Sequence, residues 1–520
     1  MSHEAFQEAI FQEPDDDAVR LIYADWLDEN GEPFWAEFIR VQCELATLTP
    51  ASEDFVRLKE REEEMQMLLP DQELAPPLEH MVDELDLASG YSHSYRRGFP
   101  STFYLEPYEP DALTEAELHQ ICERLETVIV QSAIQGLELE DFQAKQLEIL
   151  FQHRVMKRVN DLTVQWWDEW VDEEDDSLAD HAAVVASATN LSRLRSLKLE
   201  TMFTDDTLQA LTHSPHMKNL ESFEFTPSDV TPEGFEIFAT SPMAKRLRSL
   251  TCGYTRLSGE QLEALTTVVW PQLYSLEMDW NLTPEALQVL AKSQAFPNLV
   301  SLELRSNQMG LSEVEALCQN ECWQLRSLDL SYCELRSRDA RLLARSPLVE
   351  QLRSLSLSSN RIGSQGLEAL SKSPLLRELR QLDLSFNELT AGKAQALNRG
   401  EMLQNLTSLD LSLRDEDSSM PDGMEFIKAL ELPCIRHLSL SGIPLGARGV
   451  QVLVKKDWFH NLRVLNLSWC RIGKAGAEVL LEAIDSANLV RLYLNSNPNI
   501  PVKVRDRFRE QFGEKRVSLD

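Results

Sequence analysis

The chain is short of basic residues and of long apolar runs, and each shortage excludes a class of function. Among 520 residues there are 50 Lys and Arg against 85 Asp and Glu, which gives a net charge of −35. Nucleic acids and anionic membranes both bind through basic protein surfaces, so we expect neither as a partner. A protein partner with the opposite, basic charge is compatible with this composition.

Targeting signals and disulfide patterns are also missing. The first residues, MSHEAFQEAIFQEPDDD, have neither the basic start nor the apolar core of a secretion signal. No segment approaches the roughly 18 apolar residues that a membrane span needs. The eight cysteines are scattered along the chain. We therefore expect a cytoplasmic protein whose thiols are reduced.

Motifs of the common enzyme classes are absent as well. There is no glycine-rich phosphate loop, no Ser/His/Asp arrangement and no HExxH motif. Asp25 and Asp28 flank Trp26, a pattern that fits solvated helix carboxylates better than an acid–base pair. Cys318 and Cys322 lie four residues apart on a predicted helix, but a structural zinc site needs four ligands. We expect no catalytic, metal or cofactor residues.

The chain does contain a repeated phrase, Leu-x-x-Leu-x-Leu. It begins at Leu194 and returns every 26 to 29 residues. The later copies begin at Leu220, Leu247, Leu273, Leu299, Leu325, Leu352, Leu379, Leu406, Ile435, Leu462 and Leu489. A period in this range is typical of a solenoid, in which each unit buries its apolar face against its neighbours.

Each repeat predicts a strand, a turn and a helix, so the fold class is α/β. In the phrase from Leu299, Leu302 and Leu304 alternate with polar residues, as in a strand with one buried face. Ser312 is a candidate helix N-cap, and Thr231 and Thr283 each precede a proline suited to a first helical turn. Helices are about 10 Å wide and strands about 4.8 Å apart, so the stack should curve with its strands on the concave face.

This pattern resembles leucine-rich repeats of the longer, ribonuclease-inhibitor-like type. The resemblance covers roughly residues 99–520 and implies a horseshoe solenoid of about 14 units, capping units included. Weaker copies begin at Ile134 and Val159, and Phe99 begins a candidate first strand. The segment Val502–Phe512 is predicted to be the closing helix.

The ninth residue of each phrase is short and polar in several units. It is Asn281, Asn307, Asn360, Asn387 or Asn497 in five units, and Cys333 or Cys470 in two. Such a side chain can satisfy backbone groups in the turn after the strand. Elsewhere it is Met202, Ser228, Thr255, Arg414 or Ile443, so the ladder is incomplete.

Residues 1–98 lack the repeat and hold 24 acidic against 7 basic residues, a net charge of −17. The sequence predicts a small all-α domain here, with helices at Ser2–Gln12, Asp15–Asn30, Glu32–Leu48 and Ser52–Leu69. The run from Arg20 to Gly31, the segment Ala36–Gln42 and the junction Tyr95-Arg-Arg97-Gly98-Phe99 resemble the bacterial repeat-companion domain. That module is found ahead of leucine-rich repeats in some bacteria, and the resemblance implies no particular biochemical role.

Acidic residues recur at the central outward position of the strands. They are Glu224, Glu277, Glu303, Asp329, Asp383 and Asp410, and the one base at this position is Lys198. Stacking would set neighbouring carboxylates about 4.8 Å apart, and a basic partner would relieve their repulsion. Nearby serines favour the alternative of a mild, solvated face.

Aromatic residues recur at the eighth position of the phrase, where the strands end. They are Trp166, Tyr254, Trp280, Tyr332, Phe386 and Trp469. Trp and Tyr are enriched among interface anchors, although these rings could equally cover the turn region of the core. A further candidate is the insertion Trp166–Asp180, with eight acids and no base, which is either a docking loop or a solvated loop.

Together these features predict a protein-interaction module that binds a basic protein partner through an acidic and aromatic concave face. One alternative is a small catalytic or modifying domain at the N-terminus, with Asp25, Asp28 and Glu29 lining a cleft, which the repeats deliver to its target. The other is an enzyme inhibitor, suggested by the fold of the resembling repeats, although fold alone does not determine function.

Overall fold

The structure is a computed structural model of the chain. It describes residues 2–13, 16–48, 52–66, 87–91, 95–97, 99–107, 113–130, 132, 134–166, 179–253, 255–280, 282–387, 391–413, 423–484 and 488–519. The chain divides into two compact units. Unit 1 comprises residues 1–255 and 260–276, and unit 2 comprises residues 256–259 and 277–520.

Unit 1 begins with helices, as the sequence predicts. They are α1 (His3–Gln12), α2 (Asp17–Glu29), α3 (Pro33–Leu45) and α4 (Glu53–Gln66). The sequence did not indicate two of the three short strands that follow, β1 (Leu87–Tyr91) and β2 (Tyr95–Arg96). The third, β3 (Phe99–Pro100), begins at Phe99, where the sequence predicts the first strand. The buried rings of Tyr23, Trp35 and Phe38 form one cluster with Phe99, so the helical core continues into the junction with the repeats.

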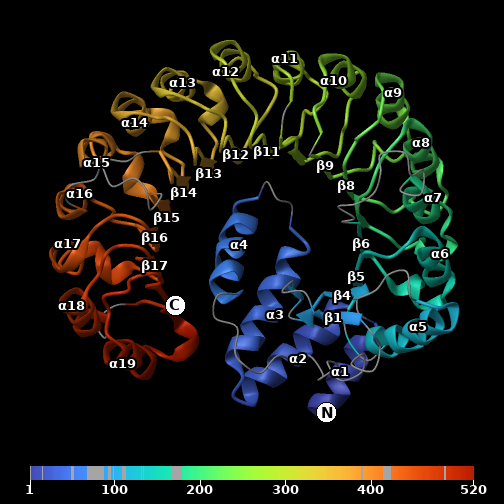
Figure 1. The fold of residues 1–520 in the computed structure, drawn as a ribbon, viewed down its shortest axis with the longest axis horizontal. Helices are drawn as coiled ribbons and strands as arrows, with labels where there is room; N and C mark the ends of the chain where they lie inside the picture. The colour runs from blue at the N-terminus through green and yellow to red at the C-terminus, as the bar shows by residue number, and fades with distance from the viewer. Residues whose placement is uncertain are drawn as a thin grey trace. The chain divides into compact units, whose positions relative to one another are not determined.

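The rest of unit 1 alternates strands with helices (Figure 1). The strands are β4 (Thr102–Pro107), β5 (Gly136–Glu140), β6 (Asp161–Gln165), β7 (Ser196–Glu200), β8 (Ser222–Phe225) and β9 (Ser249–Cys252). The helices are α5 (Glu115–Val130), α6 (Ala144–Gln152), α7 (Ala179–Ser187), α8 (Asp205–His213), α9 (Pro232–Thr240) and α10 (Gly259–Leu265). Strands β4 to β9 pair in sequence order and in parallel, and β1 pairs antiparallel with β4.

Unit 2 continues the alternation, and the boundary between the units falls within β10 (Ser275–Glu277). Its further strands are β11 (Ser301–Glu303), β12 (Ser327–Asp329), β13 (Ser354–Ser356), β14 (Gln381–Asp383), β15 (Ser408–Asp410), β16 (His437–Ser439), β17 (Val464–Asn466), β18 (Arg491–Tyr493) and β19 (Val517–Ser518). Its helices are α11 (Pro284–Lys292), α12 (Leu311–Cys318), α13 (Ser337–Leu343), α14 (Ser364–Ser371), α15 (Ala391–Leu397), α16 (Gly423–Ala429), α17 (Gly446–Leu453), α18 (Lys474–Ile484) and α19 (Val502–Phe512).

Short 3₁₀ helices lie in some of the return segments. They span Arg154–Arg158, Thr189–Leu191, Pro347–Val349, Pro374–Leu376, Met402–Asn405, Asp457–Asn461 and Glu514–Arg516. In each unit the repeat strands line the concave side of an arc, and the repeat helices, α5–α10 in unit 1 and α11–α19 in unit 2, line the other side (Figure 1). This is an α/β solenoid of leucine-rich repeats, with a helical region in front of it.

The strand register confirms the repeat and its weaker upstream copies. In unit 1, Leu137 lies opposite Leu162, and Leu162 lies opposite Leu197. In unit 2, Leu302 lies opposite Leu328, and both are buried. Each leucine therefore packs on its counterpart in the next repeat, which is how a solenoid builds a continuous core.

Two of the three predicted helix caps are confirmed, and one is wrong. The hydroxyls of Thr231 and Thr283 accept hydrogen bonds from the backbone N–H groups three residues later, and proline follows each cap. Helix α12 instead starts at Leu311 with Gly310 as its N-cap, and the Ser312 hydroxyl donates to Glu313 Oε1 (2.6 Å). Because the helix begins one residue before Ser312, this serine lies inside the first turn and not at the N-cap position.

The ninth residue satisfies turn backbone as predicted, and it also ties each repeat to the one before. Asn360 Oδ1 accepts from Leu335 N (2.8 Å), and its Nδ2 donates to Leu330 O (2.8 Å). Asn307, Asn387 and Asn497 make the same pair of bonds one repeat back. Because these groups are buried, each bond prevents an unpaired backbone group inside the protein.

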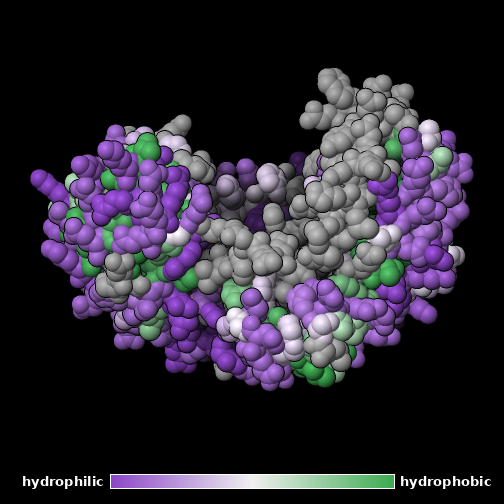
Figure 2. Space-filling view, turned by 90° about the horizontal axis from the view of Figure 1, so that it is seen from below, coloured by the Kyte–Doolittle hydropathy of each residue, from purple (hydrophilic) through white to green (hydrophobic). Residues whose placement is uncertain are grey.

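The described surface is mainly polar. In the view of Figure 2, most described side chains are hydrophilic, and hydrophobic ones occur singly or in small groups. None of the helices in the described part of the chain is both long enough and apolar enough to cross a membrane.

Candidate interaction surface

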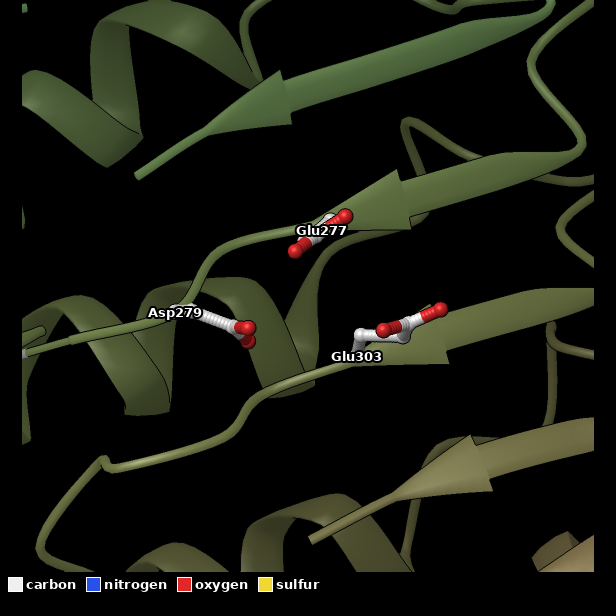
Figure 3. Close-up of side chains that lie close together, drawn as sticks. All are labelled: Glu277, Asp279 and Glu303. Atoms are coloured by element: carbon white, nitrogen blue, oxygen red, sulfur yellow. The ribbon is translucent and has the colours of Figure 1, made fainter. Parts of the chain in front are cut away.

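Three carboxylates meet where strands β10 and β11 of unit 2 end. Glu277 is the last residue of β10, Asp279 follows two residues later, and Glu303 is the last residue of β11 (Figure 3). One oxygen atom from each carboxylate lies within 4.8 Å of the others. Three hard oxygen ligands at this spacing are a set that Ca²⁺ or Mg²⁺ can use.

A counter-charge for this cluster is already supplied by the chain itself. The Arg305 guanidinium contacts Glu303, and its Nε lies 2.9 Å from Asp329 Oδ2 and 3.7 Å from Asp279 Oδ2. The repulsion that the sequence predicts between neighbouring acidic positions is thus reduced internally. A basic partner would have to share these carboxylates with Arg305.

Asp279 is the most perturbed acid of the cluster. Burial raises the pKa of its carboxyl to about 7, and the nearby charge of Glu277 adds to the rise, against a hydrogen bond from Arg305 N. That bond reaches Asp279 Oδ1 at 2.7 Å, so the side chain also holds the backbone of the next repeat. The cluster therefore changes its charge near neutral pH.

Farther along unit 2 the acids of the central row have a structural task. Asp329, Asp383 and Asp410 each accept a hydrogen bond from the backbone N–H of the serine two residues later (2.8 Å in each case). Serine hydroxyls then bridge neighbouring strands, as between Ser412 and Ser439 (2.8 Å). Burial raises the pKa of Asp383 and of Asp410. These acids therefore stabilise the turns and the sheet of their own unit.

In unit 1 the predicted acid Glu224 also has a partner. Lys198, the single base of the row, lies 3.0 Å from Glu224 and 2.9 Å from Glu200. Register places Lys198 directly opposite Glu224 on the neighbouring strand. Within the acidic row that the sequence suggests, Glu224, Glu303 and Asp329 pair with a base of the chain, and Asp329, Asp383 and Asp410 accept a backbone hydrogen bond in the turn.

Three of the predicted aromatic residues, all in unit 2, are exposed. Trp280, Tyr332 and Trp469 are 49%, 51% and 46% exposed. All three occupy the eighth position of the phrase, three residues after the strand ends. Large exposed rings at the same place in several repeats are more than the single exposed apolar residues that any surface has.

These rings stand on an unusual backbone. Trp280, Tyr332 and Trp469 have φ values of 67°, 58° and 59°, in the left-handed region that residues with a side chain rarely adopt. The residue that follows the ring can hold the turn in this conformation. Asn387, which follows Phe386, is an example. Asn387 Nδ2 donates to the carbonyls of Leu384 (3.2 Å) and Ser385 (3.3 Å), which closes the chain around Phe386.

The remaining predicted aromatics are less exposed or lie outside the described residues. Phe386 is half-buried. Trp166 is also half-buried, with its ring 5.4 Å from that of His181 and its Nε1 shielded from solvent. Tyr254 and most of the acidic insertion, residues 167–178, lie outside the described part of the chain. The binding role of these residues stays a prediction.

Two other sequence candidates have plain structural explanations. Asp25 and Asp28 both bind the guanidinium of Arg40, at 2.7 and 2.6 Å. That arrangement gives no support to the alternative of an acid–base pair. The prediction that Cys318 and Cys322 lie on one helix is wrong. Helix α12 ends at Cys318, so Cys322 lies beyond it.

Sequence reasoning overlooked Asp279 and Arg305. Both are the seventh residue of their phrases, beside the acidic fifth residues Glu277 and Glu303. Charged residues at the fifth and seventh positions of the same phrase would have been a usable signal, because both side chains point to one face of a strand.

Comparisons with known proteins agree with the repeat. Residues 351–371 and 460–481 match the family model described as Leucine Rich repeat. No curated protein matches the chain. Among solved structures, a yeast Rad7 and Elc1 complex contains a chain with 15% identity, a TM-score of 0.41, and coverage of 79% of this chain and 88% of that one. A Bacteroides fragilis protein has 16% identity and a TM-score of 0.36, over 50% and 80% of the two chains.

Proposed function

We propose that this chain is a protein-interaction module that binds a basic protein partner through unit 2. The binding surface consists of Trp280, Tyr332 and Trp469 together with Glu277 and Glu303, and we call it the aromatic edge. The exposure of three large rings at one repeat position is the observation that carries the proposal. Trp and Tyr supply large contact area and are typical anchors of interfaces.

The chemistry of the aromatic edge fits lysine and arginine side chains. Glu277, the last residue of β10, lies three residues before Trp280, so the end of one strand contributes both a carboxylate and a ring. A cation over a Trp or Tyr face gains about 0.5–2 kcal/mol, depending on its desolvation. Carboxylates nearby add attraction that weakens with salt.

The test is a capture experiment with the full chain as bait, in a lysate of its source organism, at low and at moderate salt. The variant Trp280→Ala/Tyr332→Ala/Trp469→Ala removes the rings, and Glu277→Gln/Glu303→Gln removes charge. The control Val269→Ala alters a side chain that is 56% exposed in unit 1. We expect one protein that wild type and control capture and that both other variants lose. The same protein on the triple variant would contradict the proposal.

Two further features belong to this proposal. We assign residues 1–98 to a repeat-companion type of module, supported by the buried cluster around Tyr23 and Trp35 in the resembling segment. We also place the protein in a reducing compartment such as the bacterial cytoplasm, supported by eight free cysteines, of which five are buried.

A further inference from the structure

A basic groove lies in unit 1, in a chain whose net charge is −35. Its volume is about 340 Å³, and five cationic residues line it, Arg193, Arg195, Lys218, Arg246 and Arg248. Among the described residues that line it, the single carboxylate is Glu221, 3.8 Å from Arg248. Five cations and one anion give the groove a local charge of +4.

The groove follows the edge of the sheet where the strands of unit 1 begin. In the repeats of unit 2, the exposed aromatic residues lie at the other edge, where the strands end. Arg195 and Arg248 are the residues just before β7 and β9, and Asn160 is the residue just before β6. Backbone bonds join these positions along the edge, since Arg195 N donates to Asn160 O (2.7 Å) and Arg248 N to Glu221 O (2.7 Å). The groove therefore runs along one edge of the sheet, and successive repeats contribute residues to it from the same position.

Two hydrogen-bond donors inside the groove have no acceptor. Asn160 is 2% exposed and its Nδ2 has no partner, and the Nε of Arg246 is likewise buried without one. A buried donor without a partner costs about 1–3 kcal/mol, so a ligand that offers oxygen acceptors gains by filling it. Positive charge and unpaired donors both indicate an anionic ligand.

The length of the groove selects the kind of anion. Its residues come from the segments before β6, β7, β8, β9 and β10. Five strands about 4.8 Å apart span about 19 Å, the length of roughly six residues of extended peptide. None of the described lining residues is aromatic, so the groove has no platform on which nucleic-acid bases could stack.

We infer that this groove binds an extended acidic peptide segment of a protein partner, with Asp or Glu carboxylates on Arg195 and Arg248 and an oxygen acceptor on Asn160 Nδ2. Arginine forks suit carboxylates because they donate two parallel hydrogen bonds. This binding is separate from the aromatic edge, which is in unit 2 and takes a basic partner. The two surfaces require opposite charges.

Unit 2 has a groove of about 660 Å³ at the same edge of its sheet, whose described lining includes Arg380, Arg436 and Arg463 and no carboxylate, so it holds three cations against five in unit 1. The same position before the strand is also arginine there, as in Arg353 and Arg380. Arg353 already binds Glu378, and Arg380 donates to Asn405 O (3.3 Å). These guanidinium groups bind within their own unit, whereas Asn160 and Arg246 in unit 1 still have unsatisfied donors.

The experiment measures fluorescence anisotropy of a labelled decapeptide of alternating Glu and Asp with the full chain. A decapeptide of Gln and Asn is the neutral probe. We expect the acidic peptide alone to bind, and binding to weaken as salt rises. The variant Arg195→Gln/Arg248→Gln should bind it about two- to thirtyfold more weakly, because it loses two exposed charge pairs.

Arg507→Gln is the matched control, because it removes a positive charge from an exposed residue of α19 in unit 2. It should leave the affinity unchanged. Asn160→Asp keeps the shape and replaces the donor by an acceptor, so it should also weaken binding. Equal affinity of the double variant and wild type would overturn the site. A single-stranded oligonucleotide that binds more tightly than the peptide, or full displacement of the peptide by inorganic phosphate, would overturn the peptide assignment.

Discussion

The two units are built from the same repeat pattern, but the turns that follow their strands differ. In unit 2, asparagine or cysteine at the ninth position bonds to the repeat before it, and the residue before it adopts a left-handed backbone at Ser306, Tyr332, Ser359, Phe386 and Ser496. In the last repeats of unit 1 the ninth residues are Met202, Ser228 and Thr255, and neither Thr201 nor Pro227 before the first two has positive φ, whereas Asp141, at the eighth position of the repeat from Ile134, does (φ 56°). The eighth and ninth residues of the phrase thus determine the backbone conformation of the turn after the strand.

Intermediate cases show which half of the bridge each side chain supplies. Ser228 in unit 1 accepts from Phe203 N (3.1 Å), which is the acceptor half of the asparagine bridge. Cys333 in unit 2 supplies the donor half, from its Sγ to Leu304 O (3.1 Å). Asparagine makes both bonds because an amide contains both a donor and an acceptor. Two of the exposed rings, Tyr332 and Trp469, precede Cys333 and Cys470, so their turns are held by the donor half of the bridge.

The largest effect is expected from breaking this bridge. Asn360→Ala leaves the buried Leu335 N–H and Leu330 carbonyl without partners and should destabilise the adjoining repeats by about 3 kcal/mol. Hydrogen exchange of the Leu335 amide reports the change. Asn461→Ala, which removes one 3.1 Å bond of an exposed residue to Pro433 O, is the control and should cost less than about 1 kcal/mol. Equal protection in both variants would contradict the role of the bridge.

A smaller effect follows from the buried acid at the start of unit 2. The pKa of Asp279 is about 7 in the folded protein, against an ordinary value of 3.8. The folded state therefore holds this proton more tightly, so its contribution favours folding at low pH and is lost as pH rises from about 4 to about 7. Asp279→Asn should remove this loss and be more stable than wild type at about pH 8, as denaturant unfolding measures. A difference between the two proteins that does not vary with pH would refute the assignment.

Replacing a ring by glycine should separate folding from binding. Tyr332 has φ of 58°, which costs a residue with a Cβ about 1 kcal/mol and glycine almost nothing. Because glycine also makes the unfolded chain more flexible, Tyr332→Gly should change stability by less than about 1 kcal/mol. Capture of the partner should nevertheless fall. Destabilisation well above this value would show that the ring supports the fold, as a core residue would.

The smallest effect is expected at the equivalent place in unit 1. Met202 occupies the ninth position, is 39% exposed and belongs to a turn without the asparagine bridge. Met202→Ala should change the unfolding free energy by less than about 0.5 kcal/mol, as is usual for surface residues. A loss as large as that of Asn360→Ala would remove the contrast between the units.

Local pattern predicted most of the fold. Alternating leucines such as Leu302 and Leu304 identify strands, and Thr283 before a proline identifies a helix start, because these signals lie within a few residues. The site was harder to predict because it depends on neighbours about one repeat away. The counter-charge from Arg305, the rise in the pKa of Asp279 and the donor left unpaired at Asn160 all require the stacked repeats.

The most direct test of the aromatic edge is site-specific photo-crosslinking. A photoreactive phenylalanine analogue is placed at Tyr332 and, in a separate protein, at Val502, which is 70% exposed on α19 of the same unit. If the aromatic edge is the binding surface, a basic protein crosslinks from position 332 and none crosslinks from position 502. Crosslinks from position 502 with none from position 332 would contradict this account.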